Sequence, residues 1–247
     1  MKKKRKKIRL NTGKVILVLS LVLMIITAIG VTVASSLFDS KEVELIGNKE
    51  LTKEQILEML NISYNKNIFQ YNINKMEKQL LEHAYVDTVD ITRKLPDKLS
   101  IKINEKKEMA VLSNKNTYCY IDGNGEFLKK IEEVEDKNKA IVVEVDYDIN
   151  KDNEISFKDE ESEKRLLYLL NDLQNKKIYD RMANISFKSD DIINMKTINN
   201  IEILLPKDNN IDYNISRISE VLIDLQNKSK KSGTIDLVSS RNVVYRP

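Results

Sequence analysis

The spacing of hydrophobic residues changes along the chain, and each spacing predicts a different kind of element. Residues 15–37 read VILVLSLVLMIITAIGVTVASSL and contain no charged side chain. At about 1.5 Å per residue, a helix of this length covers roughly 30 Å, the thickness of the hydrocarbon core of a bilayer. A cleaved secretory signal is the alternative, but its apolar run is only about 7–15 residues long. We therefore expect residues 15–37 to form an uncleaved transmembrane helix.

After this apolar run, the apolar residues first alternate as in a strand and then recur at helical spacing. Residues 41–48 alternate apolar and polar positions up to Gly47, which predicts a short strand. Thr52 is followed by Gln55, a capping-box pattern, and then by apolar residues at helical spacing. Asn72 precedes a second run with helical spacing and is placed to cap it. Two helices are therefore expected after the first strand.

A β-hairpin is predicted next. Residues 89–91 and 99–103 alternate apolar and polar positions on either side of Pro96-Asp97, a dipeptide typical of tight turns. The hairpin completes the order strand, helix, helix, strand, strand. We expect these elements to form one domain over residues 40–108.

The remainder, residues 109–247, consists mostly of short alternating runs separated by turn residues, which is typical of a β-rich domain. Asp122-Gly123-Asn124-Gly125 predicts a hairpin turn. The elements expected in chain order are strands at 117–121, 126–130 and 140–145, a helix at 162–173, strands at 191–196 and 201–205, a helix capped by Asn214, and one or two strands within 233–245. The whole chain is thus predicted to be α+β: one transmembrane helix, a β-α-α-β-β domain, and a β-rich domain with a few helices.

The charge is concentrated at one end of the chain. Residues 1–14 hold eight of the 41 Lys and Arg residues and no acid, so the rest has 33 basic (41 − 8) and 38 acidic residues. A basic segment before an apolar helix stays on the cytoplasmic side. We expect residues 1–14 to be a cytoplasmic tail and the bulk of the chain to be extracytoplasmic. Because the folded part is mildly acidic, nucleic acid is disfavoured as a partner.

The only cysteine and the only histidine raise the question of a thiol enzyme. Sortases share the layout of one helix with a cytoplasmic N-terminus, and they use a cysteine with a histidine. Cys119 lies in an alternating run without the Thr-Leu-x-Thr-Cys context, and His83 lies on the solvent side or boundary of a predicted helix. A thiolate nucleophile needs a neighbouring base or cation. We expect no catalytic residue and no cofactor, and keep a sortase-like enzyme as an alternative.

An acidic segment resembles a calcium loop in its spacing. Residues 148–159 place oxygen-bearing side chains at alternate positions, and a helix is predicted to follow. However, Asn153 stands where such loops have glycine, and Asp159 stands where they have a bidentate glutamate. We expect a solvated loop and no metal site, and calcium binding stays an open alternative.

The order of these elements resembles the FtsQ/DivIB family of cell-division proteins, whose first outer domain is a POTRA domain. The resemblance rests on the basic tail, the apolar helix, the β-α-α-β-β order and three stretches: Arg93 to Ile103 followed by Glu105 and Ala110, Tyr118 to Gly125, and Ile235 to Pro247. One departure is the segment 146–154, where members of the family often have a Pro-x-x-x-Gly turn.

The resemblance implies a non-enzymatic scaffold at the division septum. Its implied partners are other single-pass division proteins of the FtsL and FtsB/DivIC type, with the septal peptidoglycan synthase as a further partner, and its implied role is to help control septal peptidoglycan synthesis. The family's closing strand pairs with a partner strand. By position, this implies the partner-binding residues Val238, Ser239, Val243, Val244 and Tyr245.

Two alternatives remain open at this point. The closing strand could be an ordinary terminal strand packed in its own sheet. The chain could also be a POTRA-bearing envelope protein that serves another assembly, such as sporulation or secretion.

Overall fold

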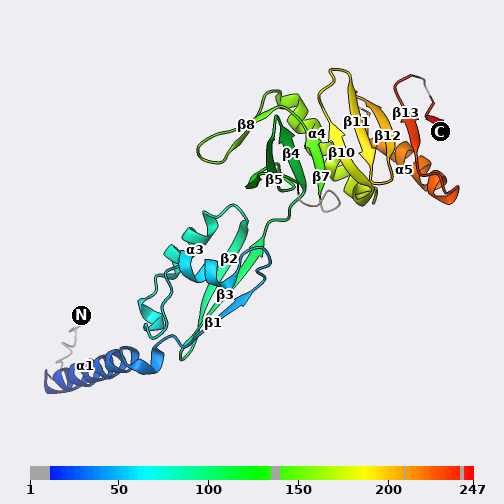
Figure 1. The fold of residues 1–247 in the computed structure, drawn as a ribbon. Coiled ribbons are helices and arrows are strands. Elements are labelled where there is room, and N and C mark those ends of the chain that lie inside the picture. The colour runs from blue at the N-terminus through cyan, green and yellow to red at the C-terminus, as the bar shows by residue number, and fades with distance from the viewer. Residues whose placement is uncertain (1–11, 135–139, 209, 240–241) are drawn as a thin grey trace, which may run out of the picture. The chain divides into compact units, whose positions relative to one another are not determined.

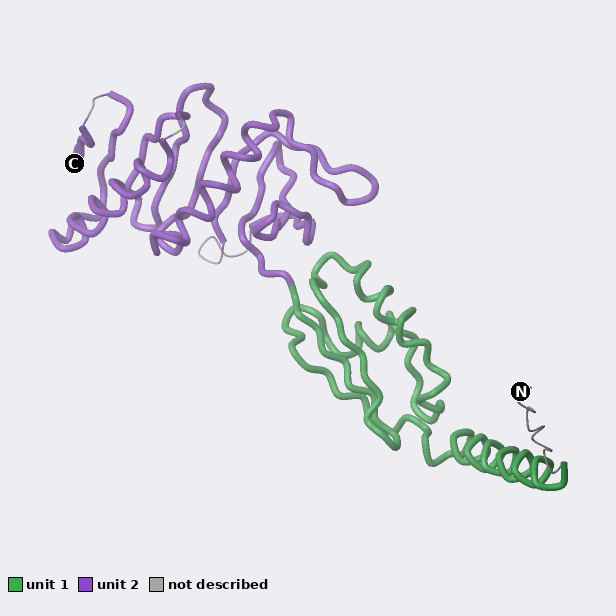
Figure 2. The backbone as a smooth tube through the Cα atoms, turned by 180° about the vertical axis from the view of Figure 1, so that it is seen from behind, with its two compact units in different colours: residues 1–105 green, residues 106–247 purple. Residues whose placement is uncertain are grey.

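The computed structural model describes residues 12–134, 140–208, 210–239 and 242–247. The chain divides into two compact units, residues 1–105 and 106–247 (Figure 2). Each unit has its own hydrophobic core. Most of the predicted basic tail, residues 1–11, lies outside the described residues.

The apolar helix α1 spans Thr12–Val33, and none of its residues is buried. Within the described residues it is the one helix long and apolar enough to cross a membrane. It ends four residues before the uncharged run does, because Ser35 is extended and the short 3-10 helix η1 follows at Ser36–Phe38. The hydroxyl of Ser35 donates to the carbonyl of Thr32 at 2.7 Å, which satisfies one of the carbonyls that a helix end leaves free.

Unit 1 continues as a three-stranded sheet with two helices, in the predicted order (Figure 1). Strand β3 lies in the centre, parallel to β1 and antiparallel to β2. The elements are β1 (Glu42–Ile46), α2 (Lys53–Met59), the 3-10 helix η2 (Ile68–Gln70), α3 (Ile73–Leu81), β2 (Val86–Lys94) and β3 (Lys98–Glu105). Fully buried Ile56 from α2 and Leu80 from α3 pack in one core with Leu99 and Ile101 from β3.

The predicted caps and hairpin of this unit are confirmed. Thr52 and Gln55 form a capping box at the start of α2, and the Asn72 side chain accepts from the backbone N–H of Lys75 at the start of α3. At the end of β3, Glu105 accepts hydrogen bonds of 2.8–3.0 Å from three consecutive backbone N–H groups, at residues 49–51. This carboxylate fixes the turn that leads into α2.

Unit 2 is built on a nine-stranded sheet in the order β14-β13-β12-β11-β10-β7-β4-β5-β6. Its strands are β4 (Ala110–Asn114), β5 (Thr117–Ile121), β6 (Phe127–Ile131), β7 (Ile141–Glu144), β10 (Met182–Ser186), β11 (Ile192–Thr197), β12 (Ile201–Pro206), β13 (Gly233–Asp236) and β14 (Val244–Arg246). A separate hairpin is formed by β8 (Tyr147–Ile149) and β9 (Ile155–Phe157). Three of the sheet's pairings, β4 with β7, β7 with β10 and β12 with β13, are parallel.

Two long helices, α4 (Glu160–Asn175) and α5 (Ile211–Asn227), cover one face of this sheet (Figure 1). Their apolar sides recur at helical spacing and join the sheet in one core. The buried residues they supply include Leu166, Leu169, Leu170, Leu173, Ile215, Ile218, Leu222 and Leu225. The 3-10 helix η3 (Tyr179–Arg181) follows α4 and leads into β10.

The start of α5 differs from the prediction. Asn210, not Asn214, is the N-cap residue, and Asn214 is buried one turn inside the helix. The helix begins earlier because Ile211 is buried in the core, so burial overrides the local capping signal. Asp208 holds this start by accepting from the backbone N–H of Asn210 at 2.9 Å.

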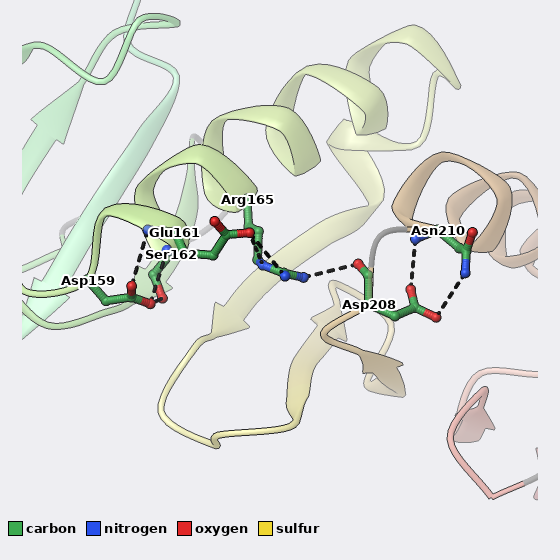
Figure 3. A network of polar contacts seen from close by, with 6 residues as sticks. All are labelled: Asp159, Glu161, Ser162, Arg165, Asp208 and Asn210. Carbon is green, nitrogen blue, oxygen red and sulfur yellow. Dashed lines mark hydrogen bonds and ion pairs between the residues drawn. The ribbon is translucent and has the colours of Figure 1, made fainter.

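Arg165 joins α4 to the loop before α5 (Figure 3). Its guanidinium contacts Glu161 on its own helix at 3.1 Å and donates to the carbonyl of Asp208 at 3.0 Å. Asp159 caps α4 by accepting from the backbone N–H groups of Glu161 and Ser162. Arg165 therefore fastens the first turns of α4 to the loop that leads into α5.

Candidate partner-binding edge

Strand β14 is the terminal strand of the nine-stranded sheet. It pairs antiparallel with β13 along Thr234–Arg246, Ile235–Tyr245 and Asp236–Val244. No other described strand pairs with β14. Its second side therefore presents backbone N–H and C=O groups without a strand partner, which is the arrangement that accepts an added strand.

The side chains of this edge alternate between the two faces of the sheet, as a strand requires. Val243 and Tyr245 are half-buried and pack against the core under the helices. The Tyr245 hydroxyl donates to the carbonyl of Ser232 at 2.5 Å. Val244 points to the opposite face and is also half-buried. Tyr245 is thus fixed within its own domain, and the open feature of the edge is the backbone.

A buried carboxylate ties the turn and the edge strand together. Asp236 at the end of β13 is 1% exposed. Its oxygens accept hydrogen bonds from the backbone N–H of Val238 at 2.8 Å and of Ser239 at 2.9 Å, and from the Ser239 hydroxyl at 2.5 Å. Arg246 on β14 donates to the same carboxylate at 2.8 Å. Breaking this cluster would release both the turn and the end of β14.

The electrostatics of the cluster favour the ionised carboxylate. The Ser239 hydroxyl, the backbone N–H groups of Ser239 and Val238, and the Arg246 guanidinium lower the pKa of Asp236 from 3.8 to about 2. Hydrogen bonds and a cation that contact the charged form stabilise it over the protonated form. The Asp236 carboxylate is therefore ionised near neutral pH. We call Asp236 and the groups that donate to it, from Val238, Ser239 and Arg246, the Asp236 clamp.

Gly233 allows β14 to approach β13 closely. Its φ is +129°, in the range where glycine is strongly preferred. A Cβ at this position would lie 2.5 Å from the carbonyl oxygen of Arg246 and 2.7 Å from the ring of Tyr245. Only a residue without a side chain fits between the two strands here.

The five predicted partner-binding residues all lie in the β13–β14 turn or on the edge. Val238 and Ser239 belong to the turn, where Val238 is 41% exposed, and the other three lie at or beside β14. Sequence reasoning missed Asp236 and Arg246. The Asp-x-x-Ser spacing at residues 236–239 was the available signal, because aspartate and serine at such spacing often close turns through side-chain hydrogen bonds.

Strand β6, at the opposite edge of the sheet, carries exposed lysine side chains. Lys129 and Lys130 are both exposed on this five-residue strand. Lysines on an edge strand oppose pairing with another chain. The two edges of the same sheet therefore differ in their charged side chains, since β6 carries two exposed lysines and the exposed Arg246 of β14 is paired with Asp236.

The cysteine of the sortase alternative is not placed for catalysis. Cys119 is fully buried in the core of unit 2, and burial raises the pKa of its thiol to about 11. His83 belongs to unit 1, where its Nδ1 accepts from the backbone N–H of Tyr85. A buried neutral thiol is a poor nucleophile, so Cys119 does not have the exposed, activated thiol that the sortase alternative requires.

The segment with calcium-loop spacing forms the β8–β9 hairpin. Asn150 Oδ1 accepts from the backbone N–H groups of Asp152 and Glu154, so it closes the turn. Asp159 caps α4. Across the described part of the chain, no three His, Cys, Asp or Glu side chains gather as metal ligands. Two of the side chains that the calcium alternative needed, Asn150 and Asp159, therefore serve a turn and a helix cap.

Two family models match the chain. The one described as "POTRA domain, FtsQ-type" matches residues 38–106. The one described as "Cell division protein FtsQ/DivIB, C-terminal" matches residues 110–237, which is just over half of the 247 residues. The second match ends before β14, so it does not include the candidate edge.

Individual relatives agree with these matches. The chain is 28% identical to the cell division protein DivIB of Clostridium tetani, over 84% of this chain and 78% of that protein. It is 22% identical to the cell division protein FtsQ of Syntrophotalea carbinolica, over 86% of this chain and 75% of that protein. A solved structure, the major extracytoplasmic domain of DivIB from Geobacillus stearothermophilus, is similar at 13% identity and a TM-score of 0.31, covering 50% of this chain and 97% of that one. At that score the structural likeness carries no argument.

Proposed function

Because this chain belongs to the FtsQ/DivIB family of cell-division proteins, we propose that it is a non-enzymatic scaffold of the division site that binds partners through the open edge of β14. The partners are other single-pass division proteins of the FtsL and FtsB/DivIC type. By holding them together, the scaffold helps to control septal peptidoglycan synthesis, with the synthase as a further partner.

The observation that carries this proposal is the pairing of β14. The strand has one partner, β13, and a second side that no described strand occupies. A strand from another protein could continue the sheet there through backbone hydrogen bonds, and exposed Val238 beside the edge could add apolar contact. The Asp236 clamp supports the same proposal, because it holds the edge in an extended form before a partner arrives, which reduces the entropy cost of binding.

A non-catalytic role is supported by the chemistry of the candidate residues. Cys119 has a buried thiol with a raised pKa. In the segment with calcium-loop spacing, the Asn150 side chain closes a turn and the Asp159 side chain caps α4. Neither set offers an activated nucleophile or a metal-bound water.

Membrane anchoring is part of the proposal. Helix α1 has the length and composition to cross a bilayer, and the basic residues before it favour a cytoplasmic N-terminus. We infer a single-pass protein whose residues 38–247 are extracytoplasmic and which is enriched at the division septum.

Site-specific photo-crosslinking in cells tests the binding edge. A photoreactive amino acid at Val244 on β14 should capture a small single-pass division protein, because an added strand would lie beside it. The matched control is Lys129 on β6, at the opposite edge of the same sheet. Capture at Val244 and not at Lys129 supports the proposal. Equal capture at both positions, or none at Val244 while the protein localises to septa, contradicts binding through β14.

Depletion of the protein separates the division role from the alternative of sporulation or secretion. Loss of a division scaffold should give filamentous cells with unfinished septa. Normal septation after depletion would contradict the proposed role, whatever the crosslinking result.

A further inference from the structure

The end of unit 1 next to α1 is formed by three segments that meet around the end of the helix. They are the connector at residues 34–41, the loop at residues 61–71 and the tip of the β2–β3 hairpin at residues 95–97. All three belong to unit 1 (Figure 2). We define this region, with its exposed residues Leu37, Tyr64, Phe69 and Leu95, as the helix-proximal surface.

The loop is fastened directly to the end of α1. Asn67 is mostly buried, and its side-chain amide donates to the carbonyl of Val33 at 2.8 Å and to the carbonyl of Ser35 at 3.3 Å. Ser40 donates its backbone N–H to the carbonyl of Lys66 at 2.9 Å. Asn67 also forms an isolated β-bridge with Asp39. The loop therefore cannot move far from the last turn of the helix.

The hairpin tip is fastened to the same connector. The backbone N–H of Lys41 donates to the carbonyl of Asp97 at 2.9 Å, and the two side chains form an ion pair at 3.1 Å. Arg93 links the hairpin to the loop by donating to the carbonyls of Ile68 at 2.8 Å and Tyr71 at 2.6 Å. Hairpin, loop and connector thus form one hydrogen-bonded assembly.

Each of these segments exposes a large apolar side chain. Leu37 on the connector is 56% exposed, Tyr64 and Phe69 on the loop are 51% and 41% exposed, and Leu95 at the hairpin tip is 64% exposed. The Phe69 ring is held in place by an edge contact with Phe38, with ring centroids 5.3 Å apart. Exposed apolar side chains that gather in one region mark an interaction surface.

The helix-proximal surface lies beside the end of α1, so its distance from the bilayer can be bounded. The headgroup layer is roughly 5–8 Å thick on each side of the hydrocarbon core. Tyr64 and Phe69 lie within three residues of Asn67, so their backbones are at most about 11 Å from the Asn67 backbone. The side-chain amide of Asn67 contacts the carbonyls at the end of α1. If α1 crosses the bilayer, these side chains are within reach of the headgroup layer, where aromatic residues are enriched in membrane proteins.

We propose that the helix-proximal surface is a second lipid-contacting site, in which Leu37, Tyr64, Phe69 and Leu95 insert into the headgroup layer of the bilayer that α1 crosses. This inference rests on the proposed membrane anchoring. Insertion at several points holds unit 1 against the membrane and limits how far it can tilt about the end of α1. The sheet of unit 1 then has a defined direction relative to the bilayer.

The absence of tryptophan from the sequence makes the test direct. The full-length chain is reconstituted into phosphatidylcholine–phosphatidylglycerol vesicles as single-tryptophan variants, Phe69→Trp and Leu95→Trp. Each variant should emit at shorter wavelength, be quenched by lipids brominated close to the headgroup, and be shielded from acrylamide. Unchanged circular dichroism and thermal unfolding confirm that each variant is folded.

The matched control is Leu81→Trp. Leu81 is 48% exposed at the end of α3, and α3 leads into the start of β2. Strand β2 extends over nine residues, about 30 Å, before it reaches the hairpin tip. The Leu81→Trp variant should stay accessible to acrylamide and should not be quenched by brominated lipid.

A fourth variant, Leu23→Trp in the middle of α1, reports whether the helix is inserted. Deep-brominated lipid quenches it if α1 crosses the bilayer. Quenching of Leu23→Trp together with acrylamide-accessible Phe69→Trp and Leu95→Trp overturns the lipid-contacting site and leaves the anchor intact. Lack of quenching at Leu23→Trp overturns the proposed anchor and the lipid-contacting site with it.

Discussion

Among single residues, Asp236 has the largest number of roles at the candidate edge. One carboxylate holds the turn through Val238 and Ser239 and holds β14 through Arg246. Because its side chain is buried at the end of β13, a replacement that cannot accept these bonds leaves several donors without a partner. The arrangement couples the charge of one residue to the position of an entire edge strand.

The lowered pKa of Asp236 predicts a pH dependence of the edge. A carboxyl group whose pKa is lower in the folded than in the unfolded chain stabilises the fold above the unfolded value and loses that contribution as pH falls. We expect β14 to be held fully above about pH 3.8 and to loosen as the pH falls toward about 2. Hydrogen exchange of the amides at 244–246, compared with Asp236→Asn, measures this.

The Asp236→Asn variant gives the control for that measurement. Its amides at 244–246 should exchange faster than those of the wild type near neutral pH, and the difference should shrink at the acidic end of the range. A difference that is constant with pH would mean that the charge of Asp236 does not hold the strand.

Some features at residue scale were predictable and others were not. Thr52 with Gln55, and Asn72, act as caps because the hydrogen bonds involved lie within one turn of the chain. Asp236 and Arg246 are ten residues apart, and their pairing depends on the register of β13 with β14. Local spacing carries no information about that register, so the clamp could not be placed from the sequence.

At the scale of elements, β13 and β14 depend on a glycine. The two strands approach so closely at Gly233 that any side chain would meet the backbone of Arg246. A side chain at residue 233 would therefore displace the strand that is proposed to bind partners.

Gly233→Ala is expected to displace β14 without unfolding unit 2. Its Cβ would lie 2.5 Å from the Arg246 carbonyl oxygen, so the strand must move away. We expect loss of photo-crosslinking at Val244 and faster amide exchange at 244–246, with the rest of the sheet protected.

Gly123→Ala is the matched control for that change, because a Cβ at Gly123 has no heavy atom within 4 Å. It should leave crosslinking and exchange as in the wild type. If Gly233→Ala behaves like Gly123→Ala in both measurements, the close approach of the two strands is not what positions β14.

Element prediction succeeded where the signal was local. The turns at Pro96-Asp97 and at residues 122–125 connect paired strands as expected. Strand β10 was not recognised, because its MANIS sequence has little alternation, yet it lies between β7 and β11 in the sheet. Its pairing partners, not its own residues, make it a strand. The β8–β9 hairpin was missed because its polar side chains resembled a ligand set.

At the scale of the whole molecule, the two units have separate cores. The core of unit 1 includes Leu80 and the core of unit 2 includes Leu170, and no residue belongs to both. Strand order in unit 2 could not be predicted, since three parallel pairings join segments that are distant in sequence. The spacing of apolar residues predicted a strand-helix-helix-strand-strand region followed by a β-rich region, and the resemblance to the FtsQ/DivIB family identified the first of them as a POTRA domain.

Separate cores predict separate effects of core mutations. Leu80 and Leu170 are both fully buried, and replacement of either by alanine should cost about 2–5 kcal/mol of unfolding free energy in its own unit. Native-state hydrogen exchange should show that Leu80→Ala lowers protection within residues 42–105 and that Leu170→Ala lowers it within residues 110–236. Loss of protection in both units from either change would contradict independent cores.

The burial of Cys119 has a practical consequence for the study of this protein. With a pKa of about 11, its thiolate fraction at pH 7 is on the order of one in ten thousand, and the sulfur is enclosed by the core. A second cysteine introduced on the surface will therefore react with maleimide dyes or spin labels far faster than the native one. The wild-type background can serve for site-selective labelling without first removing its only thiol.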